Sequence, residues 1–160
     1  IARVQGNAYG GGGGLVAACD LAVATPNARF ALTEVKLGLI PAVISPHVIA
    51  AVGERQARRY MLTAEAFDAE EAARIGLIHQ LAADEAALDA TVAAWCATFL
   101  NNGPQALAEC KALLRAVAGR PLAAPLIADT VERIAAIRVS PEGQEGLSAF
   151  LEKRKPNWVQ

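Results

Sequence analysis

The sequence predicts a mixed α/β core followed by a helical C-terminal region. Three observations predict this fold class. A short apolar run breaks into five consecutive glycines, residues 10–14, and then resumes as an apolar segment, which indicates a strand, a glycine turn and a helix. Two further apolar segments, residues 21–24 and 29–32, have the length of strands and are separated by a Pro-Asn turn. From Asp84 onward glycine becomes rare and the pattern turns helical.

The glycine run needs a physical reason, because each glycine inside a helical turn costs about 1 kcal/mol relative to alanine. The candidates are a turn with positive φ, a close backbone contact, or N–H groups that must face a ligand without a Cβ in the way. A helix that opens at such a turn directs unpaired N–H groups outward, so we expect an anion site. The run lacks the Gly-Lys-Ser/Thr ending of a P-loop and the acidic residue that a dinucleotide-binding unit has about 20 positions on.

Local signals define several later elements. Ser45 followed by proline predicts a helix start with serine as the cap. Residues 54–62 have the stripe of an amphipathic helix, and a short helix capped by Asp68 is predicted to stop at Gly76, before a strand at residues 77–81. The helices expected after these elements cover residues 84–100, 103–118, 121–139 and 140–154.

Composition indicates an ordinary soluble protein. The 160 residues are 54% hydrophobic, enough to bury a sizeable core, and the net charge of -1 gives no electrostatic footprint for nucleic acid. No run of about 18 apolar residues suggests a membrane span, and no signal peptide is visible. We therefore expect a cytoplasmic protein with neither nucleic acid nor a membrane as partner.

Cysteine and histidine do not predict a metal site. Cys19, Cys96 and Cys110 have neither the pairing nor the spacing of a zinc site or a disulfide framework, and we expect buried thiols. His47 and His79 stand alone among apolar residues, and we expect structural or surface roles for both.

Motifs spread along the whole chain carry a resemblance to one family. They are Gly6-Asn7-Ala8-Tyr9-Gly10-Gly11-Gly12, Leu15, Cys19-Asp20, Ala28-x-Phe30, Glu34, Gly38, Pro41, Gly53, Leu62-Thr63, Glu71-Ala72, Gly76-Leu77 and Ala149-Phe150-Leu151-Glu152-Lys153-Arg154. In this order and spacing the sequence resembles the enoyl-CoA hydratase/isomerase (crotonase) family.

The resemblance implies a fold and an assembly. Residues 1–83 would form the C-terminal part of the crotonase spiral of ββα units, and residues 84–160 a helical oligomerisation region that builds a homotrimer or a dimer of trimers. The chain begins at Ile1, within an expected strand, whereas family members continue upstream. We therefore expect a C-terminal part of a longer protein, with the first oxyanion donor in the upstream region.

The resemblance also implies a chemistry. The substrate would be an acyl-CoA thioester and no cofactor would be needed. The N–H of Gly11 would be the second oxyanion donor, and Glu34, which follows a strand and lies among apolar residues in the sequence, would be the acid and base. The further residues implied to bind substrate are Ala8, Tyr9, Gly10, Gly12, Leu39, Pro41, Phe150 and Lys153.

One departure from the family pattern leaves the reaction open. Many hydratases of the family have another glutamate at the position of Gly14, and a single carboxylate is the pattern of the family's double-bond isomerases. The stretch at residues 45–79 is similar to bacterial hydratases of branched, carboxylated enoyl-CoAs from leucine and isoprenoid breakdown, such as 3-methylglutaconyl-CoA. We therefore expect a hydratase, with the isomerase as the alternative. An alternative of another class is a catalytically incomplete assembly module.

A second departure concerns the bend after Pro41. Many family members have a glycine cluster there, whereas this chain has Ala42-Val43-Ile44-Ser45-Pro46. Larger side chains at this bend would reshape the acyl pocket.

Overall fold

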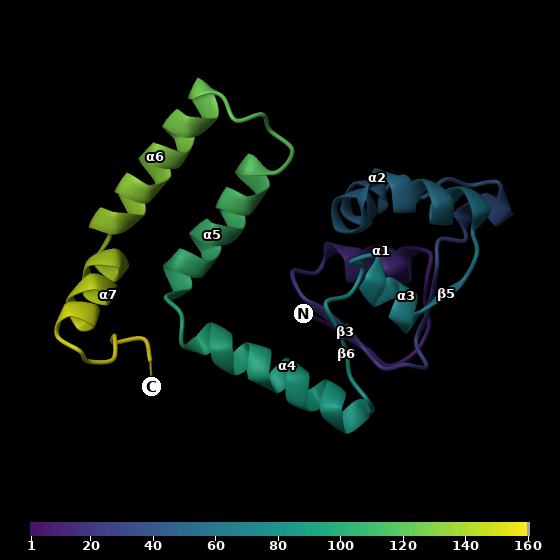
Figure 1. Ribbon diagram of the computed structural model, residues 1–160, viewed down its shortest axis with the longest axis horizontal. Helices are drawn as coiled ribbons and strands as arrows, with labels where there is room; N and C mark the ends of the chain where they lie inside the picture. Colours follow the sequence, from purple (N-terminus) through teal and green to yellow (C-terminus); the bar gives the residue numbers. More distant parts are fainter. Residues whose placement is uncertain (160) are drawn as a thin grey trace. The chain divides into compact units, whose positions relative to one another are not determined.

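Residues 1–159, the part of the chain that the computed structural model describes, contain two three-stranded sheets (Figure 1). The first sheet is parallel throughout and has the order β1-β3-β6. Its strands are β1 (Ala2–Val4), β3 (Ala22–Ala24) and β6 (Gln80–Leu81). All three residues of the central strand β3 are buried, as expected for a strand paired on both edges.

The second sheet has the order β2-β4-β5. Its strands are β2 (Ala8–Tyr9), β4 (Arg29–Ala31) and β5 (Phe67–Asp68). The pair β2 and β4 is parallel, with Tyr9 opposite Ala31, whereas β4 and β5 are antiparallel. The strands predicted at residues 21–24 and 29–32 are confirmed, and β6 is shorter than the predicted segment at 77–81.

The helices of this part of the chain follow the strands closely. They are α1 (Gly11–Ala18), the 3-10 helix η1 (Glu34–Leu37), α2 (Ser45–Thr63) and α3 (Ala69–Arg74). The sequence β2, Gly10, α1 confirms the predicted strand, glycine turn and helix. Helix α1 packs on α2 and has Gly13, Gly14 and Val16 as its buried residues.

The start of α2 differs from the prediction. Ile44, and not Ser45, occupies the N-cap position, and the hydroxyl of Ser45 donates a hydrogen bond of 2.9 Å to the carbonyl of Ala42. The serine side chain is therefore used by the preceding turn and does not cap the helix. Gly53, at φ 74° and ψ 160°, interrupts α2 and divides it into two helical pieces.

The short helix α3 agrees with its local signals. The carboxylate of Asp68 accepts a hydrogen bond of 2.8 Å from the N–H of Glu71, and Gly76 adopts φ 86° just after the helix. The predicted cap and glycine stop are confirmed.

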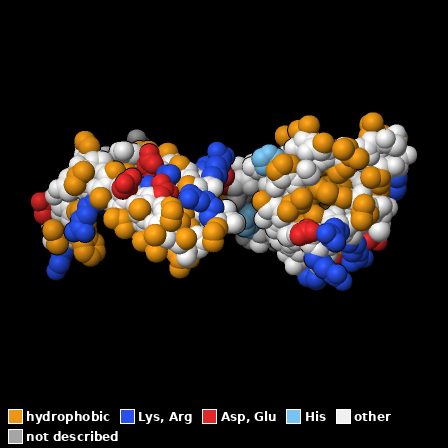
Figure 2. Space-filling model, turned by 90° about the horizontal axis from the view of Figure 1, so that it is seen from above, with side chains coloured by type: hydrophobic (Ala, Val, Ile, Leu, Met, Phe, Trp, Pro, Cys, Tyr) orange, Lys and Arg blue, Asp and Glu red, His pale blue; other side chains and the backbone are white. Residues whose placement is uncertain are grey.

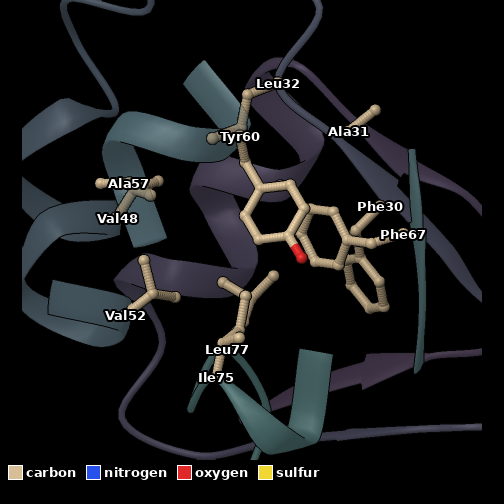
Figure 3. Close-up of a pocket in the computed structure, with 11 residues that line it drawn as sticks. Phe30, Ala31, Leu32, Val48, Val52, Ala57, Tyr60, Phe67, Ile75 and Leu77 are labelled. Carbon is tan, nitrogen blue, oxygen red and sulfur yellow. The ribbon is translucent and has the colours of Figure 1, made fainter. Parts of the chain in front are cut away.

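Aromatic side chains from α2, β4 and β5 form the centre of the core (Figure 3). The ring centroids of Phe30 and Phe67 are 5.7 Å apart, and those of Tyr60 and Phe67 are 4.1 Å apart. Val48, Val52 and Leu77 lie around these rings and line a small apolar cavity with them. This packing fixes α2 against the second sheet.

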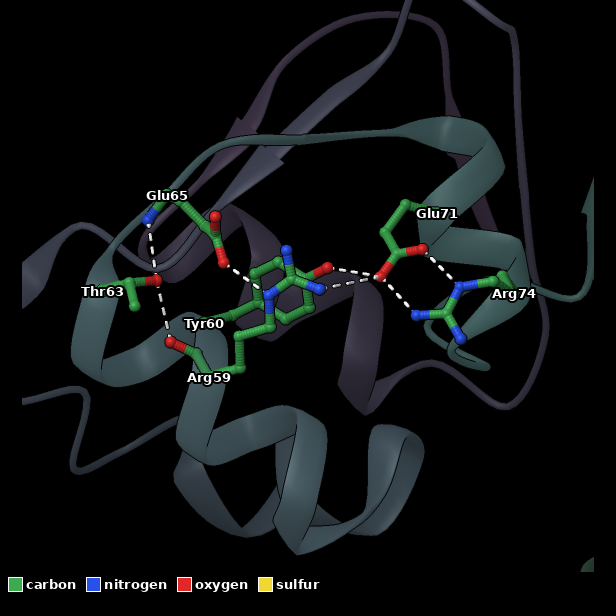
Figure 4. A network of polar contacts seen from close by, with 6 residues as sticks. All are labelled: Arg59, Tyr60, Thr63, Glu65, Glu71 and Arg74. Carbon is green, nitrogen blue, oxygen red and sulfur yellow. Dashed lines mark hydrogen bonds and ion pairs between the residues drawn. The ribbon is translucent and has the colours of Figure 1, made fainter.

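A polar network closes the core at the hydroxyl of Tyr60 (Figure 4). The hydroxyl donates to the carboxylate of Glu71, which also accepts two hydrogen bonds from Arg74, of 2.5 and 2.6 Å. The guanidinium of Arg59 lies 4.9 Å from the centroid of the Tyr60 ring and pairs with Glu65 at 2.6 Å. Hydrogen bonds from Arg74 and then from Tyr60 lower the pKa of Glu71 to about 2.

The C-terminal part of the chain is helical, as predicted. Its helices are α4 (Glu85–Leu100), α5 (Pro104–Val117), α6 (Ala124–Val139) and α7 (Pro141–Leu151). Contacts between α5, α6 and α7 form one compact unit, which begins at Trp95, and residues 1–94 form the other. Helix α4 crosses from one unit to the other, and the division at residue 84 into a spiral core and an oligomerisation region stays a prediction.

The three cysteine side chains are less buried than expected. Cys19 is half-buried, whereas Cys96 and Cys110 are exposed. The prediction of buried thiols is therefore wrong for the two cysteines of the helical unit, where the helices leave much apolar surface uncovered.

Candidate active site

The parallel pairing of β2 and β4 brings the glycine run and Glu34 to one edge of the second sheet. Both strands end at this edge, since Tyr9 lies opposite Ala31. The N–H of Gly10 continues the ladder and donates a hydrogen bond of 2.8 Å to the carbonyl of Ala31. Glu34 follows β4 by three residues and opens η1. The carboxyl ends of parallel strands are the usual place for ligand sites in α/β folds.

Gly10 requires glycine because of its backbone conformation. Its φ of 51° and ψ of -121° define a conformation that residues with a Cβ rarely adopt. A Cβ at this position would be in ordinary contact with Glu34, 3.4 Å from its Oε1. The carboxylate of Glu34 therefore lies directly beside the turn that opens α1.

Helix α1 begins at Gly11. Its ladder of hydrogen bonds begins with the N–H of Gly14, which donates to the carbonyl of Gly10 at 3.2 Å, so the N–H groups of the residues before Gly14 have no acceptor within the helix. Within residues 1–159 the N–H of Gly11 donates no hydrogen bond. A Cβ added to Gly11 would have no protein atom within 4 Å. The protein itself does not demand glycine here, so a ligand is the better reason for it.

The carboxylate of Glu34 is partly unsatisfied. Its Oε2 is buried and has no hydrogen-bond partner within the described chain. Its main-chain carbonyl accepts from Leu39 at 3.1 Å, which holds the turn after η1. The apolar surroundings expected from the sequence are incomplete, because Leu37 is 75% exposed and Phe30 lies in the core. A buried acceptor without a partner is suited to bind a proton or a ligand donor.

Both groups line one groove of about 580 Å³. Its walls come from α1, from the bend between η1 and α2, and from the first turn of α2. The lining residues are Gly11, Gly14, Leu15, Ala18, Glu34, Ile40, Pro41, Ala42, Val43, Ile44 and His47. Figure 2 shows that apolar side chains gather over the unit formed by residues 1–94, beside a group of basic side chains. The groove is mainly apolar, with Glu34 as the one acid among its described lining residues.

The residues that the sequence singled out have different positions. Gly11, Glu34 and Pro41 line the groove. Gly10 lies against Glu34, and Gly12 follows Gly11 in the first turn of α1.

The remaining expected substrate contacts lie outside the groove lining. The side chain of Ala8 is buried in the core, and those of Tyr9 and Leu39 are exposed. Phe150, on α7, and Lys153, just after it, belong to the helical unit and are exposed. Their roles as substrate contacts stay predictions.

Four lining residues were not expected in the site, namely Leu15, Ala18, Ile40 and His47. His47 is exposed, as a surface role requires, and Ile44, in the bend that was expected to reshape the acyl pocket, lies against Gly14. The apolar bend after Pro41 was the available signal, but it did not predict which of its side chains faces α1. His79 fits the expected structural role, because its Nδ1 accepts a hydrogen bond of 3.1 Å from the N–H of Ala22.

The described residues lack two further features. No group of three or more His, Cys, Asp or Glu side chains within residues 1–159 could hold a metal ion. None of the described helices has both the length and the apolar character needed to cross a membrane.

The chain is an α/β protein with a candidate site at the ends of two neighbouring parallel strands. In this site the N-terminus of α1 and the carboxylate of Glu34 line the same groove. Comparison with known proteins identifies the family. Residues 1–160 match the family described as "Enoyl-CoA hydratase/isomerase". The chain therefore belongs to the enoyl-CoA hydratase/isomerase family, and it has the crotonase fold.

Similar proteins support this assignment. The crystal structure of an enoyl-CoA hydratase from Shewanella pealeana has 49% sequence identity and a TM-score of 0.91, and the match covers 97% of this chain and 58% of that chain. Pseudomonas aeruginosa AtuE has 41% identity and a TM-score of 0.91, over 98% of this chain and 62% of that chain. The 2,3-dehydroadipyl-CoA hydratase of Escherichia coli strain K12 is 33% identical, over 99% of this chain and 62% of its own length. The chain thus spans about three fifths of the length of these relatives.

Proposed function

We propose that the full-length natural protein adds water to the double bond of a 2-enoyl-CoA thioester. The observation that carries this proposal is that the free N–H of Gly11 and the carboxylate of Glu34 line one groove. A hydratase needs both groups in one place, because negative charge develops on the thioester oxygen while a proton moves at the neighbouring carbons.

The proposed reaction assigns one task to each group. Glu34 takes a proton from water while the water oxygen bonds to C3 of the substrate, and the electrons of the double bond move toward the thioester. The N–H of Gly11 stabilises the resulting enolate oxygen, an interaction for which typical values are about 2.7 to 4 kcal/mol. Glu34 then delivers a proton to C2, so that H and OH have been added and the carboxylate is restored.

The acyl group of the proposed substrate is branched or carboxylated, as in 3-methylglutaconyl-CoA. His47 supports this choice, because it lines the otherwise mainly apolar groove and its ring N–H can donate to a substrate carboxylate. The relative from E. coli supports it also, since its name specifies an acyl group derived from a dicarboxylic acid. Phe150 and Lys153 remain proposed contacts for the CoA moiety, and both are exposed.

Double-bond isomerisation is the second candidate. It is favoured by Gly14, which offers no carboxylate, so that Glu34 is the one acid among the described lining residues. In that reaction Glu34 removes a proton from C2 of a 3-enoyl thioester and returns it to C4, and no water is added.

We also propose that the helical unit assembles the protein as a homotrimer or a dimer of trimers. Exposed apolar side chains on its helices support this proposal, among them Leu114, Val131, Ile134, Val139 and Leu151. Sedimentation equilibrium of the natural full-length protein tests it, and a monomer would contradict it. The assembly-module alternative predicts that the 160-residue chain oligomerises but turns over no thioester.

Product mass after incubation decides between the reactions. The natural full-length protein is incubated with 3-methylglutaconyl-CoA, crotonyl-CoA and a 3-enoyl-CoA. A product heavier by one water supports the hydratase, and a product of unchanged mass that chromatography separates from the 3-enoyl thioester supports the isomerase. Glu34→Gln should lower kcat by about 10²- to 10⁴-fold. Hydration by this variant at close to the parent rate would refute the role of Glu34.

A further inference from the structure

Gly14 and Ile44, two lining residues of the groove from different elements, lie in direct contact. Gly14 is a buried residue of α1, and Ile44 occupies the N-cap position of α2. A Cβ added to Gly14 would have Cγ2 of Ile44 as its nearest neighbour, with Cβ of Ile44 at 2.5 Å and Cδ1 at 3.4 Å. Real side chains do not approach so closely, and Cβ is fixed to the main chain, so rotating Ile44 does not clear the space. Residue 14 and residue 44 therefore cannot both carry side chains in this backbone.

The position of Ile44 is fixed by its main chain. Its carbonyl accepts hydrogen bonds from the N–H groups of His47, at 3.1 Å, and Val48, at 3.0 Å. The next residue, Ser45, donates its N–H to the carbonyl of Pro41 at 3.0 Å, which closes the bend on the other side. The side chain of Ile44 is half-buried and packs against the hydrophobic core. It is therefore a rigid part of the groove wall.

The neighbouring apolar side chains of the groove are held less firmly. Val43 is 88% exposed and Ile40 is 76% exposed, whereas Ile44 is half-buried against α1. Exposed side chains can change rotamer when a ligand enters, but a packed side chain can do so only at a cost in packing energy. Among the apolar side chains of the bend, Ile44 is the one that can limit the space available to a ligand.

We propose that Ile44 limits the size of the acyl chain that the groove accepts, and that Gly14 is the matched position that makes room for it. This inference rests on the proposed acyl-CoA function. Shortening Ile44 to alanine adds space next to the groove lining shared by Gly11 and Glu34. Longer acyl chains should gain most from that space, since each additional methylene in an apolar pocket changes kcat/KM by about 10- to 200-fold.

The steric match is tested by stability, independently of any activity. Gly14→Ala is made in the natural protein and in the Ile44→Gly variant, and thermal unfolding is followed for each. We expect Gly14→Ala to lower Tm by at least about 3 °C when Ile44 is present and not to lower it when residue 44 is glycine, because only glycine lacks the Cβ that meets residue 14. Gly12→Ala is the control on the same helix, because its added Cβ would lie 4.0 Å from its nearest neighbour, the Cβ of Ala8. An unchanged Tm for Gly14→Ala beside Ile44 would overturn the match.

The acyl-size role is tested by substrate preference. The ratio of kcat/KM for 2-hexenoyl-CoA to that for crotonyl-CoA should rise at least about tenfold in Ile44→Ala. Ile49→Ala, on an exposed position of α2 outside the groove lining, is the control and should keep the parent ratio. An unchanged ratio in an active Ile44→Ala variant would overturn the acyl-size role alone. Absence of turnover of either thioester by the unmodified protein would overturn the proposed function, and the Tm comparison would still decide the steric match.

Discussion

The carboxylate of Glu142, on α7, accepts a hydrogen bond of 2.7 Å from the N–H of Ala106, in the first turn of α5. It accepts a second one of 2.8 Å from the N–H of Gln105. A side chain from another helix therefore caps α5, whose own N-cap residue is Gly103. The negative charge also complements the positive end of the α5 dipole.

Replacing this cap should destabilise the helical unit. Glu142→Ala leaves two N–H groups of α5 without their partner, and we expect a loss of about 1 to 2 kcal/mol in the free energy of unfolding. Urea denaturation followed by circular dichroism measures the loss. Glu132→Ala, an exposed acid on α6, is the matched control. Equal stability of the two variants would show that the cap contributes nothing.

The carboxylate of Glu71 should make stability depend on pH under acidic conditions. Its pKa of about 2 lies below its ordinary value of 4.5, so the stability that it contributes is complete above pH 4.5 and is lost as the pH falls through 2. Glu71→Gln should cost about 1 to 3 kcal/mol at pH 7, and this cost should disappear as the pH falls toward 2. Urea denaturation at a series of pH values provides the measurement. Glu70→Gln, an exposed neighbour on α3, is the control, and a pH-independent cost for Glu71→Gln would contradict the expectation.

Gly11→Ala should separate folding from activity. The added methyl group meets no protein atom within 4 Å and replaces glycine in a helix, so Tm should stay equal or rise. The same methyl group enters the groove beside the proposed thioester oxygen, and a displacement of about 1 Å there can lower kcat/KM by about 10²-fold. Gly6→Ala is the control, because its Cβ also meets nothing within 4 Å and Gly6 lies outside the groove lining. Normal kcat/KM in Gly11→Ala would argue against the N–H of Gly11 as the oxyanion donor.

His47 should distinguish charged from uncharged acyl groups. Under the proposed function, His47→Ala removes a donor to the substrate carboxylate and should raise KM for 3-methylglutaconyl-CoA about tenfold or more, since a hydrogen bond to a charged group contributes about 1.5 to 3 kcal/mol. KM for crotonyl-CoA, which has no such carboxylate, should change less than about twofold. Steady-state kinetics with both thioesters measures the difference. Equal effects on both substrates would assign His47 a role in shaping the groove and none in recognising charge.

The parts of the fold that the sequence predicted depend on local signals. The cap at Asp68 and the stop at Gly76 act within a few residues of α3, and the glycine run sets the turn before α1 by its own backbone freedom. Ser45 shows the limit of such signals. Its hydroxyl could either cap the helix that follows or bond the turn that precedes it. It donates to the carbonyl of Ala42 in the preceding turn.

The parts of the site that were missed depend on contacts between distant residues. Nothing in the spacing of residues 41–46 indicates that Ile44 packs on Gly14, because that contact exists only after α1 and α2 have packed together. His47 enters the groove for the same reason. Gly11 and Glu34 could be proposed in advance as site residues because motifs of the family mark them, and the pairing of β2 with β4 supplies the physical reason for their proximity.

The break at Gly53 has an evolutionary consequence. The piece of α2 before it carries His47 and follows Ile44, whereas the piece after it carries Tyr60 and the network around Glu71. Because the non-helical φ and ψ of Gly53 put a kink between the two pieces, a mutation that tilts one of them need not reorient the other. Under the proposed function, selection can therefore alter which thioester is preferred through the first piece while the second preserves thermal tolerance.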